Sequence, residues 1–110
     1  MGKSFDDTVG WPKPLTRGEL YELMHNSNTK DYNRLKAAEE CMELALALQQ
    51  QVLKTSVKVS DQEIIDEIGD VKIRIKVLEK MYSRKEIRKR VKLKTNKFIS
   101  WAMSGKHTNI

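Results

Sequence analysis

Paired carboxylates at helical spacing are the feature of this sequence with the clearest chemistry. Glu40 and Glu43 are three residues apart, and so are Glu67 and Asp70, which follow the first pair after 23 residues. Residues three and four apart lie on one face of an α-helix, so each pair shares a face, as Glu39 also does with Glu43. Like charges at this spacing destabilise an isolated helix by roughly a few tenths of a kcal/mol. Two such pairs therefore suggest a ligand that offsets their repulsion.

A hard divalent cation is the ligand that four carboxylates indicate. Mg²⁺ and Mn²⁺ take oxygen ligands, and Mg²⁺ keeps coordination positions for water and for substrate phosphates. If the two helices that carry the pairs pack against each other, Glu40, Glu43, Glu67 and Asp70 can hold one such ion or a pair of ions. The alternative is that all four are solvated side chains, because charged residues are mostly exposed.

The residues around these acids resemble the motifs of the MazG-like, all-α nucleoside triphosphate pyrophosphohydrolases. That family has an ExxE motif followed by ExxD, the second usually in the form E-[LI]-G-D-[VL]. Here residues 38–44 read AEECMEL and residues 66–71 read DEIGDV. Residues 94–99, KTNKFI, resemble the TNxKF segment that follows the metal motifs in the family. The resemblance extends over about residues 31–101 and keeps the family's order of motifs.

Some positions depart from the family pattern. Cys41 and Met42 stand where a small residue and a glycine are common. After Asp70 the family continues with an apolar run, whereas here Lys and Arg alternate with Ile and Val. The segment that resembles TNxKF is one residue shorter and lacks the arginines that often follow it. These differences bear on substrate choice and assembly, and the four acidic positions are unaffected.

The resemblance implies an Mg²⁺-dependent hydrolase that converts an NTP or dNTP to the monophosphate and pyrophosphate, and so clears or balances nucleotide pools. Glu40, Glu43, Glu67 and Asp70 would bind the Mg²⁺, which would bridge triphosphate oxygens and neutralise charge on the leaving pyrophosphate. A metal-activated water would attack the α-phosphorus, and Glu39 would orient that water or accept its proton. Glu39 can equally be a solvated residue of the helix surface.

A triphosphate also requires cations from the protein. Lys36 lies one turn before Glu40, and Arg74 lies one turn after Asp70, so both can reach a phosphate held at the metal. The alternative for both is an ordinary ion pair on the helix surface. Further candidates near the C-terminus, of which the last two are supported by the resemblance, are Lys94, Asn96 and Lys97.

Aromatic side chains offer surfaces on which a nucleotide base could stack. Tyr32 and Trp101 are the main candidates, and Trp11 and Phe98 are further ones. Large aromatic side chains more often lie in a core or an interface, which is the alternative for each of them.

Four helices are expected to position these residues. A hydroxyl residue followed three positions later by Glu is the spacing of a capping box, and it marks helix starts at Thr16, Ser60 and Ser83. The second helix is expected to begin near Asn28 or Thr29 and to end at about residue 53. The third helix has apolar residues at intervals of three and four, which is a helical period, at Ile64, Ile68, Val71, Ile75 and Leu78.

The fold predicted from these elements is all-α: a four-to-five-helix bundle of the all-α NTP pyrophosphatase type, completed by dimerisation. The run LALAL at residues 44–48 is apolar almost all round its helix, which indicates burial on more than one side. In so short a chain a second copy is the expected cover, and the resemblance implies a homodimer or a dimer of dimers. The expected organisation is an extended arm over 1–15, one helical MazG-like domain over 16–104 with a basic helix over 83–104, and a tail over 105–110.

The composition favours a single soluble domain without a membrane partner. Of the 110 residues, 39% are apolar and 33% are charged, as in a helix-rich globular domain. No apolar run approaches the roughly 18 residues of a membrane-spanning helix. The first residues lack the apolar stretch of a secretory signal, so a cytoplasmic location is expected. Cys41 is the only cysteine, which excludes an internal disulfide.

The net charge of +6 is unevenly distributed along the chain. Residues 83–110 contain nine Lys and Arg and one acid, whereas residues 1–82 contain twelve bases and fourteen acids. A basic segment binds phosphate backbones, so a second hypothesis is a small basic helical nucleic-acid-binding or regulatory protein without catalysis, acting through residues 83–97. That hypothesis does not explain the paired acids, and we favour the enzyme. A third hypothesis, a catalytically silent relative, is disfavoured by the complete ligand set.

Overall fold

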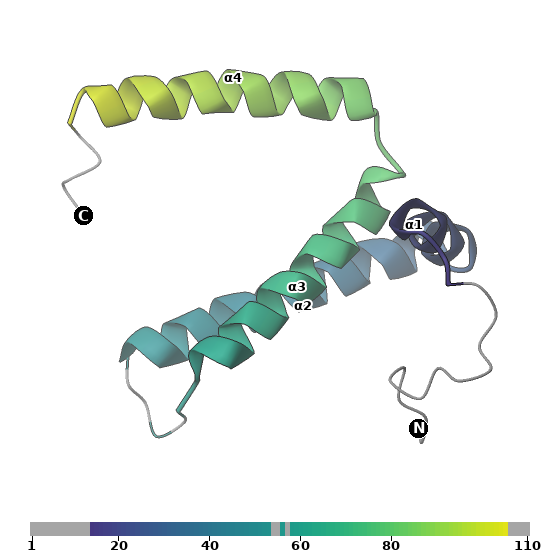
Figure 1. The fold of residues 1–110 in the computed structure, drawn as a ribbon, viewed down its shortest axis with the longest axis horizontal. Coiled ribbons are helices and arrows are strands. Elements are labelled where there is room, and N and C mark those ends of the chain that lie inside the picture. Colours follow the sequence, from purple (N-terminus) through teal and green to yellow (C-terminus); the bar gives the residue numbers. More distant parts are fainter. Residues whose placement is uncertain (1–13, 54–55, 57, 106–110) are drawn as a thin grey trace.

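The computed structural model describes residues 14–53, 56 and 58–105, and over these residues it has four helices and no strand (Figure 1). The helices are α1 (Arg17–Asn26), α2 (Lys30–Leu53), α3 (Asp61–Glu79) and α4 (Arg84–Met103). The all-α prediction is therefore confirmed. Within the described residues, no helix combines the length and the apolar character that crossing a membrane requires. Most of the expected N-terminal arm and the expected tail after residue 105 lie outside the described residues.

The helix starts follow the hydroxyl residues of the sequence. At Thr16 the capping box is complete, since its Oγ1 accepts from the backbone N of Glu19 (3.1 Å) and Glu19 Oε1 accepts from the backbone N of Thr16 (2.8 Å). Ser60 Oγ and Ser83 Oγ accept from the backbone N three residues on, at 3.2 Å and 3.1 Å. At the start of α2, Thr29 Oγ1 accepts from a first-turn N–H in the same way. Each bond satisfies a donor that the helix leaves unpaired.

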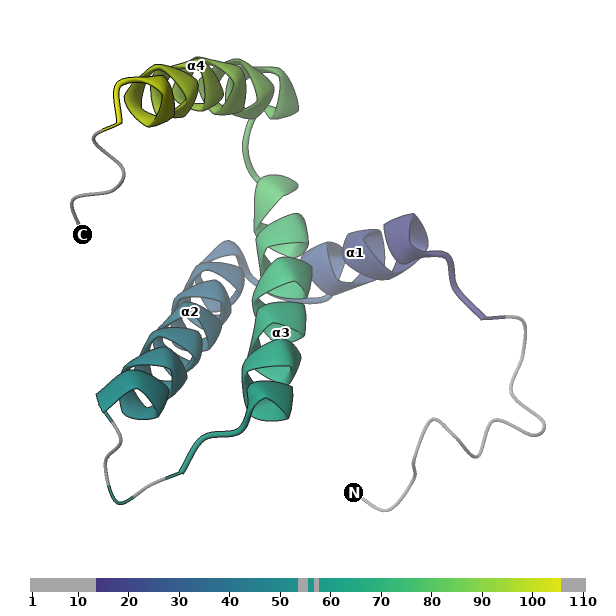
Figure 2. The ribbon, with the colours of Figure 1, turned by 60° about the vertical axis from the view of Figure 1, so that its left-hand side comes forward.

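The core of the chain is small and lies where α2, α3 and α1 meet. Helices α2 and α3 pack as a hairpin, and α1 packs on α3 (Figures 1 and 2). Among the described apolar residues only Ala37 and Val77 are buried, at 3% and 1% exposure. Asn33 is buried at 2% exposure, and nothing in the structure explains its carboxamide, which has no hydrogen-bond partner among the described residues.

Helix α4 lies apart from the other three helices. After α3 the chain turns, and α4 extends away from the hairpin in both views (Figures 1 and 2). Every residue of α4 is exposed except Ile87, which is half-buried. The radius of gyration, 18.2 Å, is correspondingly larger than the roughly 13 Å of a compact domain of this length.

The apolar side of α2 is also uncovered within one chain. Leu35, Met42 and Leu46 are 70%, 68% and 54% exposed, although the sequence pattern indicates that this helix is buried on more than one side. The hairpin with α3 covers one side of α2 and leaves the other open. The prediction of a second copy as the cover is therefore untested by the single chain.

The small core predicts a large effect from its central residue. We expect Val77→Ala to lower the free energy of unfolding by about 1–3 kcal/mol, because it removes two methyl groups from a fully packed site. Val52→Ala, at a position that is 74% exposed, is the matched control and should change it by less than about 0.5 kcal/mol. Urea unfolding followed by circular dichroism measures both. Equal effects would show that α2 and α3 do not pack around Val77.

Candidate metal centre

The packing of α2 on α3 brings acidic side chains from both helices together. One carboxylate oxygen from each of Glu40, Glu67 and Asp70 lies within 4.8 Å of the other two. Along α2, oxygens of Glu39, Glu40 and Glu43 meet the same limit. Glu40 belongs to both groups, so the four acids of the predicted ligand set and Glu39 form one connected cluster.

Two carboxylate oxygens in this cluster are buried and unsatisfied. Oε2 of Glu40 and Oε2 of Glu67 have no hydrogen-bond partner among the described residues, and both side chains are half-buried. A buried carboxylate oxygen without a donor or a cation is unfavourable, because the charge has lost its water and gained nothing in exchange. Glu39, Glu43 and Asp70 are exposed, so the cluster is open to solvent on one side.

The electrostatics of the cluster favour a cation. Burial raises the pKa of Glu40 above its ordinary value, and the charges of Glu43 and Asp70 raise it further, while the ammonium group of Lys36 acts against them. Burial also raises the pKa of Glu67, again with help from Asp70 and Glu40. A divalent cation bound between these oxygens would reverse the repulsion. The oxygen-only donor set fits Mg²⁺ or Mn²⁺, and its open side leaves room for water or phosphate oxygens.

Lys36, next to the cluster, has a different ion-pair partner from the one that its position one turn before Glu40 suggests. Lys36 forms an ion pair with Glu39, whose Oε1 is 3.3 Å from Lys36 Nζ, so the surface pair is with Glu39 and not with Glu40. That pair raises the pKa of Lys36. Arg74 lies one turn beyond Asp70 on α3 and is half-buried.

The structure does not bring the predicted contacts on α4 to the carboxylates of the same chain. Lys94, Asn96 and Lys97 are exposed on α4, which extends away from the hairpin (Figure 1). The rings of Phe98 and Trp101 pack edge to face on α4, with centroids 6.2 Å apart and planes at 76°. Tyr32 is half-exposed in the first turn of α2, and Trp11 lies outside the described residues.

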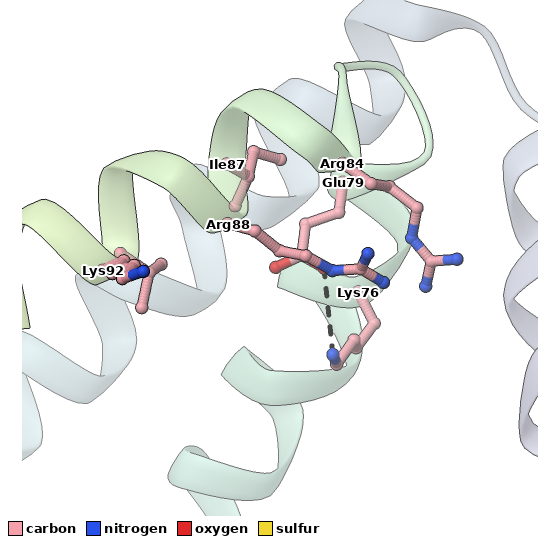
Figure 3. Close-up of a pocket in the computed structure, with 7 residues that line it drawn as sticks. Lys76, Glu79, Arg84, Ile87, Arg88 and Lys92 are labelled. Atoms are coloured by element: carbon pink, nitrogen blue, oxygen red, sulfur yellow. Dashed lines mark ion pairs between the residues drawn. The ribbon is translucent and has the colours of Figure 1, made fainter.

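A charged cavity at the end of α3 was not expected from the motifs. The basic residues early in α4 are exposed. The structure places some of them around a cavity of about 360 Å³ together with residues of α3 (Figure 3). The signal for this arrangement is the spacing of Arg84, Arg88 and Lys92, which follow one another at intervals of four and so share a helix face.

The comparisons with known proteins add no relative. No protein-family model matches the chain, and neither does any curated protein or any solved structure. The resemblance to MazG-like enzymes therefore rests on the motif residues themselves.

Removing one charge from the cluster should stabilise the metal-free protein. We expect Glu40→Gln to raise the melting temperature in EDTA at neutral pH, because it relieves repulsion at half-buried oxygens. The raised pKa values mean that the folded state binds protons more readily than the unfolded state. The contribution of proton binding at Glu40 and Glu67 to the free energy of unfolding therefore increases as the pH falls from neutral toward the ordinary carboxyl range. It is lost as the pH rises through the folded-state pKa.

Thermal melts of both proteins at about pH 5.5 and about pH 7.5 measure the effect. The gain on acidification should be smaller in Glu40→Gln than in the wild type. Asp31→Asn is the control, since Asp31 pairs with Arg34 at 3.1 Å and its loss should bring no gain. A Glu40→Gln protein that melts below the wild type at neutral pH would contradict the repulsion.

Proposed function

We propose that the protein is an Mg²⁺-dependent nucleoside triphosphate pyrophosphohydrolase, which cleaves an NTP or dNTP to the monophosphate and pyrophosphate. The supporting observation is the pair of buried, unsatisfied oxygens of Glu40 and Glu67 beside Asp70. Solvated surface acids would have water as their partner, whereas these oxygens have lost it. The motif resemblance supplies the reaction class, and Mn²⁺ is an alternative cation.

The residues of the cluster take distinct roles in this proposal. Glu40, Glu43, Glu67 and Asp70 hold the cation, which when bound activates the phosphate group and neutralises charge. Glu39 accepts a proton from the attacking water. The water oxygen forms a bond to the α-phosphorus, the bond from that phosphorus to the bridging oxygen breaks, and pyrophosphate leaves with the electron pair.

Cations of the chain complete the substrate contacts. Lys36 Nζ lies 3.3 Å from Glu39 Oε1, beside the cluster, and provides one positive charge for a phosphate oxygen. Arg74 follows Asp70 by one turn and provides a second positive charge on α3. Tyr32, exposed near the start of α2, is the base-stacking candidate on the hairpin.

Gly69 lies between Glu67 and Asp70 in the sequence but on a different side of α3, because residues one and two apart do not share a helix face. It stands in the middle of α3 directly before Asp70, where glycine destabilises a helix by about 1 kcal/mol relative to alanine. No described atom lies within 4 Å of the position that a Cβ would take, so packing within the chain does not require a glycine. Close approach of another chain to this side of α3 would require one.

We further propose that the enzyme is a homodimer or a dimer of dimers. The two apolar residues that are buried among the described ones are too few for a stable domain of this length, and large apolar side chains are exposed on α2 and on the C-terminal half of α4. A second copy that covers Leu46 on α2 and Phe98 on α4 would bury this surface. Because α4 extends away from its own hairpin, Lys94, Asn96, Lys97 and Trp101 would then serve the site of a neighbouring copy.

The hydrolysis has a direct test at the cluster. We expect Glu40→Gln and Asp70→Asn each to reduce monophosphate and pyrophosphate formation by at least about a hundredfold, since each removes a metal ligand. The measurement is chromatographic product analysis with each common NTP and dNTP, with Mg²⁺ and with EDTA. Asp66→Asn, an exposed acid of α3 outside the cluster, is the control and should keep its activity. Diphosphate and phosphate as products would refute the reaction, and full turnover in either ligand variant would refute the site.

The assembly has a separate test. We expect light scattering after gel filtration to give the mass of two or four chains, well above the 12.8 kDa of one. Leu46→Lys should shift the protein toward the monomer, because it places a charge in the apolar surface of α2. Gln49→Lys adds the same charge at an exposed polar position of α2 and should leave the mass unchanged. A wild-type mass of one chain would overturn the proposal.

A further inference from the structure

The corner where α3 ends and α4 begins forms a cavity that is open to solvent and separate from the carboxylate cluster. Lys76 and Glu79 of α3 line one wall, and Arg84, Arg88 and Lys92 of α4 line the other, around a volume of about 360 Å³ (Figure 3). Lys76 is six residues beyond Asp70, so the cavity begins roughly 9 Å further along α3. Consecutive parts of one chain build it.

The cavity carries an excess of positive charge over the described residues that line it. Glu79 is its one acid, and that carboxylate pairs with Lys76 at 3.8 Å. Arg84, Arg88 and Lys92 have no ion pair with any described carboxylate. In Figure 3 the side chains of Arg84 and Arg88 extend from α4 over the end of α3, where Lys76 also lies. The three free cations therefore border one space.

A smaller cavity of about 250 Å³ continues this one toward α1. It shares Lys76, Glu79 and Arg84 with the first and adds Lys80 and Tyr21. Lys80 pairs with Glu22 of α1 at 3.2 Å, and this ion pair joins α1 to the end of α3. The positive corner is thus extended enough for more than one anionic group.

We propose that this corner binds the phosphate groups of a second ligand, distinct from a substrate at the metal centre. A guanidinium group matches a phosphate with two parallel hydrogen bonds, and Arg84 and Arg88 offer two such groups beside two ammonium groups. A volume of about 360 Å³ is within the range of small-ligand sites. Ile87 and Val91 line the same cavity and give the non-phosphate part an apolar surface. Two sources supply this chemistry: a free nucleotide and the backbone of a nucleic acid.

Binding without metal tests the corner independently of hydrolysis. In EDTA the metal-free carboxylate cluster repels phosphates. Binding measured in EDTA therefore reports only on the basic side chains of the protein. The probes are ATP in calorimetric titration and a fluorescein-labelled 20-nucleotide single strand of DNA in anisotropy titration. We expect Arg88→Gln with Lys92→Gln to weaken the binding of at least one probe about tenfold or more. Loss for ATP as well as DNA identifies a nucleotide site, and loss for DNA alone identifies a nucleic-acid site.

A matched pair of substitutions separates the cavity from the general charge of α4. Lys85→Gln with Arg90→Gln removes the same charge from the same helix at positions that do not line either cavity. This control should weaken binding by less than about threefold. Lys76→Gln, on α3, should weaken binding as the α4 pair does, which a site on α4 alone would not show. Circular dichroism and gel filtration verify the fold and mass of each variant.

Three results would overturn the proposal. Equal losses in the cavity pair and the control pair would mean that binding follows net charge and not the cavity. Absence of binding by either probe to the wild type would mean that the corner holds no phosphate. A lower oligomer mass in the Arg88→Gln, Lys92→Gln protein, with the control unchanged, would assign the corner to the contact between copies. None of these results depends on whether the protein hydrolyses nucleotides.

Discussion

The contact between α2 and α3 brings together the groups that attract and the groups that repel. Ala37 and Glu40 are three residues apart on α2, and Asp70 and Val77 are two turns apart on α3, so on each helix a core residue and an acid share a face. Packing α3 against α2 around Val77 therefore also brings oxygens of Glu40, Glu67 and Asp70 within 4.8 Å of one another. The chain cannot bury its core without assembling this cluster. A bound cation would turn that repulsion into a favourable contact.

Local signals in the sequence predict the helices well, because each start depends on residues three positions apart. The complete box at Thr16 and the hydroxyl caps at Ser60 and Ser83 are examples. The acidic pair on each helix is predictable for the same reason, since the helix period places Glu40 beside Glu43 and Glu67 beside Asp70, whereas the meeting of the two pairs depends on the packing of α2 on α3. The ion-pair partner of Lys36 is less predictable from the sequence, because Glu39 and Glu40 are both within reach and the side-chain rotamers decide between them.

The position of α4 could not be derived from the sequence in the same way. A stripe such as Ile87, Val91 and Phe98 states which side of a helix is apolar, but it does not state what covers that side. The turn between Glu79 and Arg84 decides the direction of α4, and with it the cavity that Lys76 and Arg88 line. The acidic and basic side chains are also separated in space. The acids of the hairpin and the cations of the corner lie at different levels of α3, so one chain presents an acidic cluster and a basic corner at separate places.

The isolation of α4 divides the monomer into parts of unequal stability. Helices α1, α2 and α3 share Val77 and its neighbours as a core, whereas every residue of α4 is exposed except the half-buried Ile87. A helix of 20 residues without tertiary packing is close to its helix–coil balance in water. In a separated chain the amide hydrogens of α4 therefore exchange with solvent through opening of that helix alone. The amide hydrogens of α2 and α3 exchange only when the hairpin opens. Exchange rates would therefore be slower before Ser83 than after it.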